Sequence, residues 1–233
     1  MNYNANFLNT LSESFHTYLK TSARSNEKLK ILHSTIAQDL ENKLGQEFFV
    51  FAYNIGEGKE KTLKGSYYDK KVDIAIFKNN QAMAGVAVKF VMSNYLQNSN
   101  NYFEAMLGET ANLRTNHLPY FQILIIPEIM PYFNRNGKII KNEELKESHL
   151  HKYLKLSQDN EHIFYHTPNK TLLVVVQLPD FHYAQHKNEY IQACQKQFLR
   201  YSAKFDGIQF EKNVILNDYA AFLDKVFHAI LAS

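Results

Sequence analysis

Asp73 and Lys89 are the residues of this sequence whose types and spacing best suit catalysis. They lie in the segment KKVDIAIFKNNQAMAGVAVKF, residues 70–90, which reads as two strands joined by the turn KNNQ. Side chains alternate between the two faces of a strand, so both residues fall on the face opposite the aliphatic side chains. If the turn pairs the two strands so that these faces coincide, Asp73 and Lys89 come within diagonal reach of each other across the hairpin. A carboxylate beside an amine can hold a cation and neutralise the charge that develops on a phosphate.

The elements around this hairpin decide between a catalytic pair and an ordinary surface ion pair, which contributes little to stability. Apolar spacing predicts a helix over residues 25–44, and a second helix is expected over 99–116. The stretch YFQILIIP, 120–127, reads as a strand buried on both faces, and therefore as a central strand. This order predicts an α/β fold with a mixed central β-sheet flanked by helices. The other expected elements are strands over 47–55 and 170–178 and helices over 5–20, 142–157, 187–204 and 216–231.

This arrangement resembles the nuclease core of the PD-(D/E)xK superfamily, which includes many type II restriction endonucleases. The family motif has an Asp on one strand and acid-x-Lys on the next, followed by a helix and a buried strand. The matching parts here are VD at 72–73, AVK at 87–89, the helix from 99 and FQILIIP. The resemblance implies a restriction-endonuclease-like core with additional helices at both ends.

The resemblance also implies how the chain is divided. We expect a single nuclease domain over residues 1–233, with its core at about 25–130. Residues 131–233 would complete the sheet and add elements for DNA recognition and dimerisation. A chain of this length, with 45% apolar residues, can bury the core that such a domain needs.

Ala87 departs from the motif, because the family pattern has an acidic residue there. One interpretation is that the second carboxylate has moved to the following helix, where Glu104 lies fifteen residues after Lys89 on a face of small or polar residues. Glu109, on the same helix, is turned away from Glu104 and is a second choice. Other interpretations are an engineered Glu→Ala change at position 87 and a relative that has lost catalysis.

The resemblance implies a Mg²⁺-dependent reaction. Asp73 and Glu104 would hold the ion, which is a hard cation that prefers carboxylate and water oxygens. Lys89 would orient the attacking water and stabilise the oxygens of the reacting phosphate.

The expected partner is double-stranded DNA. The net charge of +3 permits binding to a polyanion without requiring it, and only four of the 26 basic residues are arginines. Lysine suits phosphate contacts, whereas arginine and asparagine can read base edges. The residues expected to contact DNA are Lys71, Asn94, Asn98, Asn101, Arg114 and Arg135.

We therefore interpret the sequence as a type II restriction endonuclease that cleaves double-stranded DNA at a specific sequence. Such an enzyme is expected to act as a homodimer, so that two sites cut the two strands of a palindrome. A cognate DNA methyltransferase is expected as a genetic neighbour, not as a bound subunit. Two alternatives remain: a repair or recombination nuclease that reads DNA structure, and a catalytically inactive DNA-binding protein on a nuclease fold.

The composition predicts a cytoplasmic protein with no membrane contact. The single cysteine, Cys194, cannot form an internal disulfide, which fits a reducing compartment. The sequence contains no apolar run of about 18 residues, so no transmembrane helix is expected. The N-terminal residues lack the basic and then apolar pattern of a signal peptide.

Overall fold

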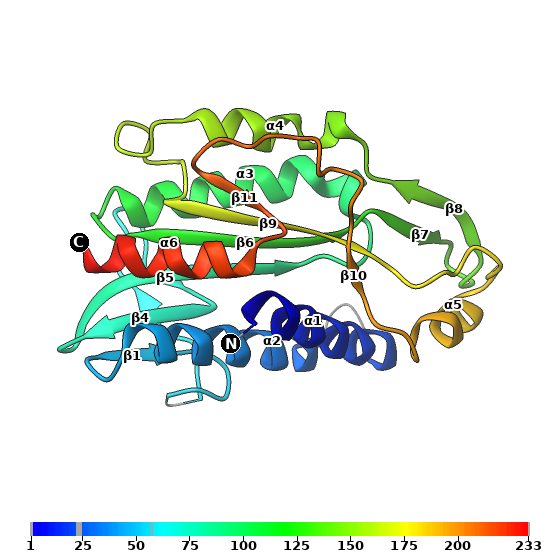
Figure 1. Cartoon of the computed structure of the whole chain (residues 1–233), viewed down its shortest axis with the longest axis horizontal. Coiled ribbons are helices and arrows are strands. Elements are labelled where there is room, and N and C mark those ends of the chain that lie inside the picture. Colours follow the sequence, from blue (N-terminus) through cyan, green and yellow to red (C-terminus); the bar gives the residue numbers. More distant parts are fainter. Residues whose placement is uncertain (1, 22–24, 57, 233) are drawn as a thin grey trace.

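A computed structural model describes residues 2–21, 25–56 and 58–232 of the chain. These residues form an α/β fold around a mixed, curled sheet of seven strands in the order β1-β4-β5-β6-β9-β10, with β11 also paired to β9 (Figure 1). The strands of this sheet are β1 (Phe48–Phe51), β4 (Ile74–Lys78), β5 (Gln81–Phe90), β6 (Tyr120–Pro127), β9 (Lys170–Gln177), β10 (Arg200–Tyr201) and β11 (Val214–Leu216).

The centre of the sheet confirms the expectation drawn from YFQILIIP. Strand β6 lies between β5 and β9 and runs parallel to both, while β4 pairs with β5 in the antiparallel sense. Every residue of β6 is buried. Ile123 and Ile125 pack into the core on one face, and Leu124 and Ile126 pack into the core on the other. A strand covered on both faces needs apolar side chains at successive positions, which explains the unbroken run.

Helices cover both faces of the sheet (Figure 1). On one face, α1, α2 and α6 enclose the larger hydrophobic core, and on the other face α3 and α4 enclose a second core against β6 and β9. The described helices are α1 (Tyr3–Lys20), α2 (Glu27–Leu44), α3 (Tyr95–Arg114), α4 (Glu147–Gln158), α5 (Lys187–Cys194) and α6 (Tyr219–Leu231). None of these helices combines the length and the apolar character needed to cross a membrane.

Two small hairpins lie outside the central sheet. Strands β2 (Thr62–Leu63) and β3 (Lys70–Lys71) pair just before β4, and β7 (Ile129–Phe133) pairs with β8 (Ile139–Glu144) just after β6. The sequence pattern predicts neither pair, and it expects a helix from residue 142, where β8 is still running. The turn between β7 and β8 contains Gly137 in a left-handed conformation, with φ of 76°.

The hairpin of β4 and β5 matches its prediction, including the turn at Asn79 and Asn80, both of which have positive φ. Helix α3 begins at Tyr95, four residues before the expected start, because Asn94 ends the preceding loop in a left-handed conformation. Helix α5 ends at Cys194, and the segment after it returns to the sheet as β10.

Candidate metal centre

Asp73 lies directly before β4, at the point where the β4–β5 ladder ends. Ile74 opposite Val86 is the last pair of that ladder. Beyond it, the carboxylate Oδ2 of Asp73 accepts a hydrogen bond from the backbone N–H of Val88 at 2.7 Å. A backbone donor at the end of a ladder needs an acceptor, and the Asp73 side chain supplies one. The position of the carboxylate is therefore fixed by the strand that carries Lys89.

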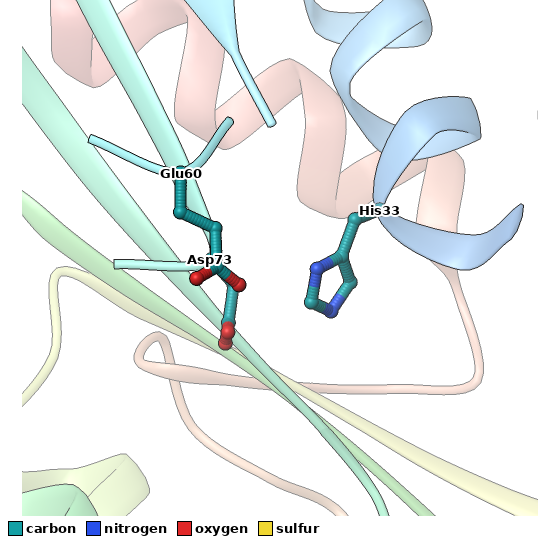
Figure 2. Close-up of side chains that lie close together, drawn as sticks. All are labelled: His33, Glu60 and Asp73. Carbon is teal, nitrogen blue, oxygen red and sulfur yellow. The ribbon is translucent and has the colours of Figure 1, made fainter. Parts of the chain in front are cut away.

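Two further side chains meet this carboxylate: His33 from α2 and Glu60 from the loop between β1 and β2. The ligand atoms of His33, Glu60 and Asp73 all lie within 4.8 Å of one another. Figure 2 shows the imidazole of His33 pointing toward the two carboxylates from across the gap. We call these three residues the metal-ligand triad.

The neighbouring hairpin positions Glu60. The Val72 N–H donates to the carbonyl of Lys61 at 3.1 Å, which ties the Glu60 loop to the chain that enters β4. The Glu60 carboxylate also forms an ion pair with Lys71, at 2.8 Å, and its side chain is only 12% exposed. This pairing raises the pKa of Lys71, through the hydrogen bond first and the charge second.

The triad fits the ligand set of a divalent cation. In an octahedral site with bonds of about 2.1 Å, two ligand atoms lie roughly 3 Å apart when adjacent and about 4.2 Å apart when opposite. The ligand atoms of the triad lie within 4.8 Å of one another, so each distance between them would shorten by about 2 Å or less on binding a cation. The structure also leaves a buried group without a partner: neither ring nitrogen of His33 has a hydrogen bond, although the residue is completely buried. Burial lowers the pKa of His33 despite the opposing charges of Asp73 and Glu60, and Lys89 lowers it further. Burial thus favours the neutral form of the ring, which is the form that binds a metal.

Lys89 is close enough to the triad for its charge to act on His33, and its ion-pair partner among the described residues is Glu109 and not Asp73. The Nζ of Lys89 is 3.8 Å from the Oε1 of Glu109, and the Nζ of Lys70 is 2.8 Å from the same oxygen. Tyr120 contacts the other Glu109 oxygen at 3.5 Å, and its pKa is raised well above its usual value by burial and then by the charges of Glu109 and Asp73. Glu109 thus holds Lys70 and Lys89 near the C-terminal end of β5.

The structure places Glu104 away from this group. Glu104 is exposed, and its charge acts on Lys152 of α4, whose pKa it raises against the larger lowering effect of burial. Glu104 and Glu109 are about 140° apart around α3, because successive residues advance by about 100°. The helical carboxylate that contacts Lys89 is therefore Glu109, which the sequence ranks second. The carboxylate grouped with Asp73 is Glu60, which precedes the hairpin.

Ala87 occupies the position opposite Asp73. The register that pairs Ile74 with Val86 brings residues 73 and 87 level with each other. The Ala87 side chain is 2% exposed and packs in a small apolar cluster with Leu63, Leu113 and Tyr120. Position 87 therefore supplies no ligand, and the carboxylate that lies near Asp73 is that of Glu60.

Five of the six residues expected to contact DNA are accessible. Lys71, Asn94, Asn101 and Arg135 are exposed, and Asn98 is half-buried with its amide donating to the carbonyl of Asn94 at 3.1 Å. The three asparagines lie at the beginning of α3, which follows the strand that carries Lys89. Arg135 lies in the turn of the β7–β8 hairpin.

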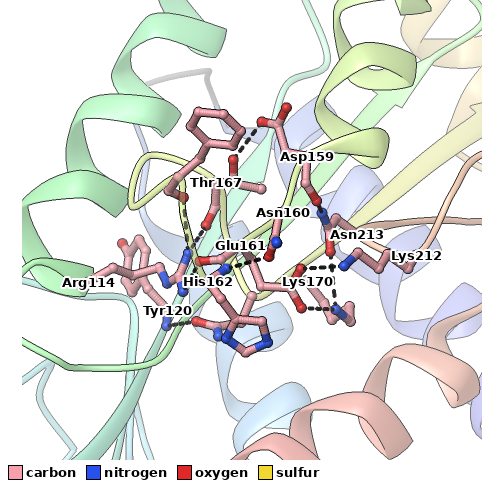
Figure 3. Close-up of polar contacts among 12 residues, drawn as sticks. Arg114, Tyr120, Asp159, Asn160, Glu161, His162, Thr167, Lys170, Lys212 and Asn213 are labelled. Carbon is pink, nitrogen blue, oxygen red and sulfur yellow. Dashed lines mark hydrogen bonds and ion pairs between the residues drawn. The ribbon is translucent and has the colours of Figure 1, made fainter.

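Arg114 has a different place from the one that the sequence suggests. It is 7% exposed, and its guanidinium donates hydrogen bonds to the backbone carbonyls of Glu161, Phe164 and Thr167, at 2.6, 3.3 and 2.5 Å (Figure 3). Burial lowers its pKa, and the nearby charge of Glu161 opposes this effect. The arginine holds the loop that follows α4 against the end of α3. We therefore assign it a structural role, which corrects its expected role in DNA binding.

Replacing Arg114 with Met is expected to lower the free energy of unfolding by roughly 2–4 kcal/mol, because three buried carbonyls lose a charged donor. Urea denaturation followed by circular dichroism measures the change. Arg135→Met is the matched control, since this exposed arginine should change stability by less than about 0.5 kcal/mol. Equal stability of the two variants would contradict the structural role of Arg114.

The sequence pattern singles out neither His33 nor Glu60. His33 lies beside Leu32 and one turn from Ile36, within the stripe that α2 buries, and a polar residue in such a stripe is the available signal. Glu60 lies in a loop among lysines, where a glutamate usually serves as a solvated counter-charge. Only the folding of that loop against β4 reveals its proximity to Asp73.

Comparison of the chain with protein-family models, with curated proteins and with solved structures finds no match. Function is therefore inferred from the geometry of these residues.

Proposed function

We propose that this chain is a divalent-cation-dependent nuclease that hydrolyses phosphodiester bonds in double-stranded DNA. The observation that carries the proposal is the metal-ligand triad beside Lys89, at the end of the β4–β5 hairpin. Carboxylates that share a cation next to an amine suit reactions in which negative charge grows on phosphate oxygens. The order of hairpin, helix and central strand agrees with the nuclease core that the sequence resembles.

Each residue has a distinct role in this proposal. Asp73, held by the Val88 N–H, and Glu60 would bind the cation, together with His33. A cation bound there supplies a Lewis acid and lowers the pKa of a coordinated water. Lys89 orients the attacking water and donates to a phosphate oxygen. Glu109 is a positioning residue, because its carboxylate lies 3.8 Å from the Lys89 amine and holds it beside the site.

The surface around the site suits a DNA backbone. Lys71 is exposed beside Glu60, and Asn94 and Asn101 are exposed on the segment that follows β5. Lysine and asparagine side chains both contact phosphate oxygens, and asparagine can also read adenine edges. Arg135 is also exposed, in the turn of the β7–β8 hairpin.

The finer form of the proposal is a type II restriction endonuclease. It would recognise a specific sequence, act as a homodimer in the cytoplasm and be encoded beside a cognate DNA methyltransferase. A cavity of about 590 Å³ at the carboxyl ends of β6 and β9 supports a reading surface separate from the triad. Its lining includes Gln177, Gln197 and Arg200, whose side chains can form paired hydrogen bonds with adenine or guanine.

Digestion of plasmid DNA with the purified chain tests the proposal. We expect discrete fragments with Mg²⁺ or Mn²⁺ present and intact plasmid when EDTA removes the cation. A smear would replace the sequence-specific form with a nuclease that reads DNA structure or cuts without specificity. Uncut plasmid that still shifts on a gel would overturn catalysis and favour a DNA-binding protein, the alternative that Ala87 suggests.

A further inference from the structure

His33 is a polar residue whose ring nitrogens form no hydrogen bond that would hold the surrounding structure in place. It is completely buried, and its ring stacks on Tyr53 at a centroid distance of 6.0 Å. Neither Nδ1 nor Nε2 has a hydrogen-bond partner. Its neighbours on the buried face of α2 include Leu32, Ile36 and Ala37, and an apolar ring would suit that face equally well.

An unpartnered imidazole is costly to bury. A buried polar group that has lost its bonds to water without replacement destabilises the fold. A cation bridging the ring and the facing carboxylates of Glu60 and Asp73 would remove this penalty, and Figure 2 shows the ring directed at them. The geometry thus points to a ligand rather than to packing.

From this arrangement we infer that His33 is the third protein ligand of the metal centre and makes the site select Mn²⁺ over Mg²⁺. The inference rests on the metal centre of the proposed function, and it changes the cation that the sequence alone suggests. An acidic pair would suit Mg²⁺, which prefers oxygen ligands and keeps its waters. Imidazole favours transition metals, and carboxylates suit Mn²⁺ as well as Mg²⁺. Of the two ions that suit an oxygen-rich nuclease site, Mn²⁺ therefore accepts both kinds of ligand in the triad, whereas Mg²⁺ is suited only to the oxygens.

Isothermal titration of the metal-free full chain, without DNA, tests this selectivity. We expect MnCl₂ to bind at least about tenfold more tightly than MgCl₂. A residue that only hydrogen-bonds to a metal ligand typically contributes about 10- to 100-fold to metal affinity. Loss of the ligand in His33→Phe should therefore weaken Mn²⁺ binding by at least that factor. The phenylalanine keeps the stacking on Tyr53, and the affinity for Mg²⁺ should change little.

Two further variants complete the experiment. His162→Ala removes an exposed imidazole outside the triad and should keep the preference for Mn²⁺. His33→Gln supplies an oxygen in place of the nitrogen and should lose the preference, which provides a second test if the phenylalanine variant fails to fold. Equal affinities of the parent chain for the two ions, or Mn²⁺ selectivity that survives a His33 replacement, would overturn the inference.

The outcome is separable from that of the proposed function. Tight Mn²⁺ binding that depends on His33, in a chain that cuts no DNA, would keep the metal site and reject the nuclease. Cleavage of DNA with no preference between the two ions would keep the nuclease and reject the role of His33.

Discussion

Replacing Asp73 with Asn is expected to abolish DNA cleavage while leaving the fold intact. The asparagine amide oxygen can still accept the hydrogen bond from the Val88 N–H, so the end of the β4–β5 ladder keeps its partner. The negative charge is lost, and with it one ligand of the triad. Replacing a residue that only hydrogen-bonds to a metal ligand typically reduces activity by about 10- to 100-fold. Loss of the ligand itself should therefore reduce cleavage by more than about 100-fold.

Asp69→Asn is the matched control for this prediction. Asp69 is exposed, lies four residues earlier in the chain and has no place in the triad. Cleavage rates and cation affinity should match those of the parent chain. The Asp73 variant should still shift DNA on a gel, because the exposed lysines and asparagines remain. Parent-like cleavage by Asp73→Asn would remove this residue from the mechanism.

The sheet could be predicted from the sequence because its signals are local. Alternation along residues 74–76 and 84–88 and the apolar run of β6 determine which faces are buried, and the structure confirms both. The alternation fails at Val72, which packs with Ala75 and Ala87 and not with Ile74 and Ile76. The β7–β8 and β2–β3 hairpins were not predictable in the same way. Strands β2, β3 and β8 are short or largely polar, so they lack the apolar alternation that marks a half-buried strand. Strand β7, with the sequence IMPYF, is apolar, but Pro131 at its centre argues against a strand there.

The metal-ligand triad shows the limit of sequence reasoning more sharply. Asp73 was found because a strand pattern surrounds it, whereas Glu60 and His33 depend on how a loop and a helix pack against that strand. The choice between Glu104 and Glu109 depends on the rotation of α3 about its own axis. That rotation is set by Met106, Thr110 and Leu113, which are buried, and these residues place Glu109 on the side of Lys89.

The same packing bears on Ala87. The motif that the sequence resembles has an acidic residue there, and a migrated carboxylate, an engineered change or the loss of catalysis could each explain its absence. The apolar neighbours of Ala87 and the nearby carboxylate of Glu60 favour a site whose second acid comes from outside the hairpin. This second acid lies before the hairpin in the chain and not after it: Glu60 precedes Asp73, whereas the expected Glu104 follows Lys89.

Lys89→Met is expected to stop cleavage without removing the cation. Methionine keeps the apolar stem of the side chain and removes only the ammonium group, so the triad of His33, Glu60 and Asp73 is untouched. A donor aimed at the charge that develops in the transition state contributes about 100- to 1000-fold, and we expect a loss of that size in the rate of plasmid cleavage. Titration with MnCl₂ should give an affinity within a few-fold of the parent value, since no ligand has been lost.

Lys70→Met separates this role from a general effect of positive charge. Lys70 lies closer than Lys89 to Glu109, at 2.8 Å against 3.8 Å, and its loss removes the same charge from the same carboxylate. If Lys89 acts on the reacting phosphate, the Lys70 variant should keep most of its cleavage rate and show mainly weaker DNA binding at high salt. Equal losses in the two variants would instead mean that Lys89 contributes only to the local field, and the assignment of a catalytic lysine would have to be withdrawn.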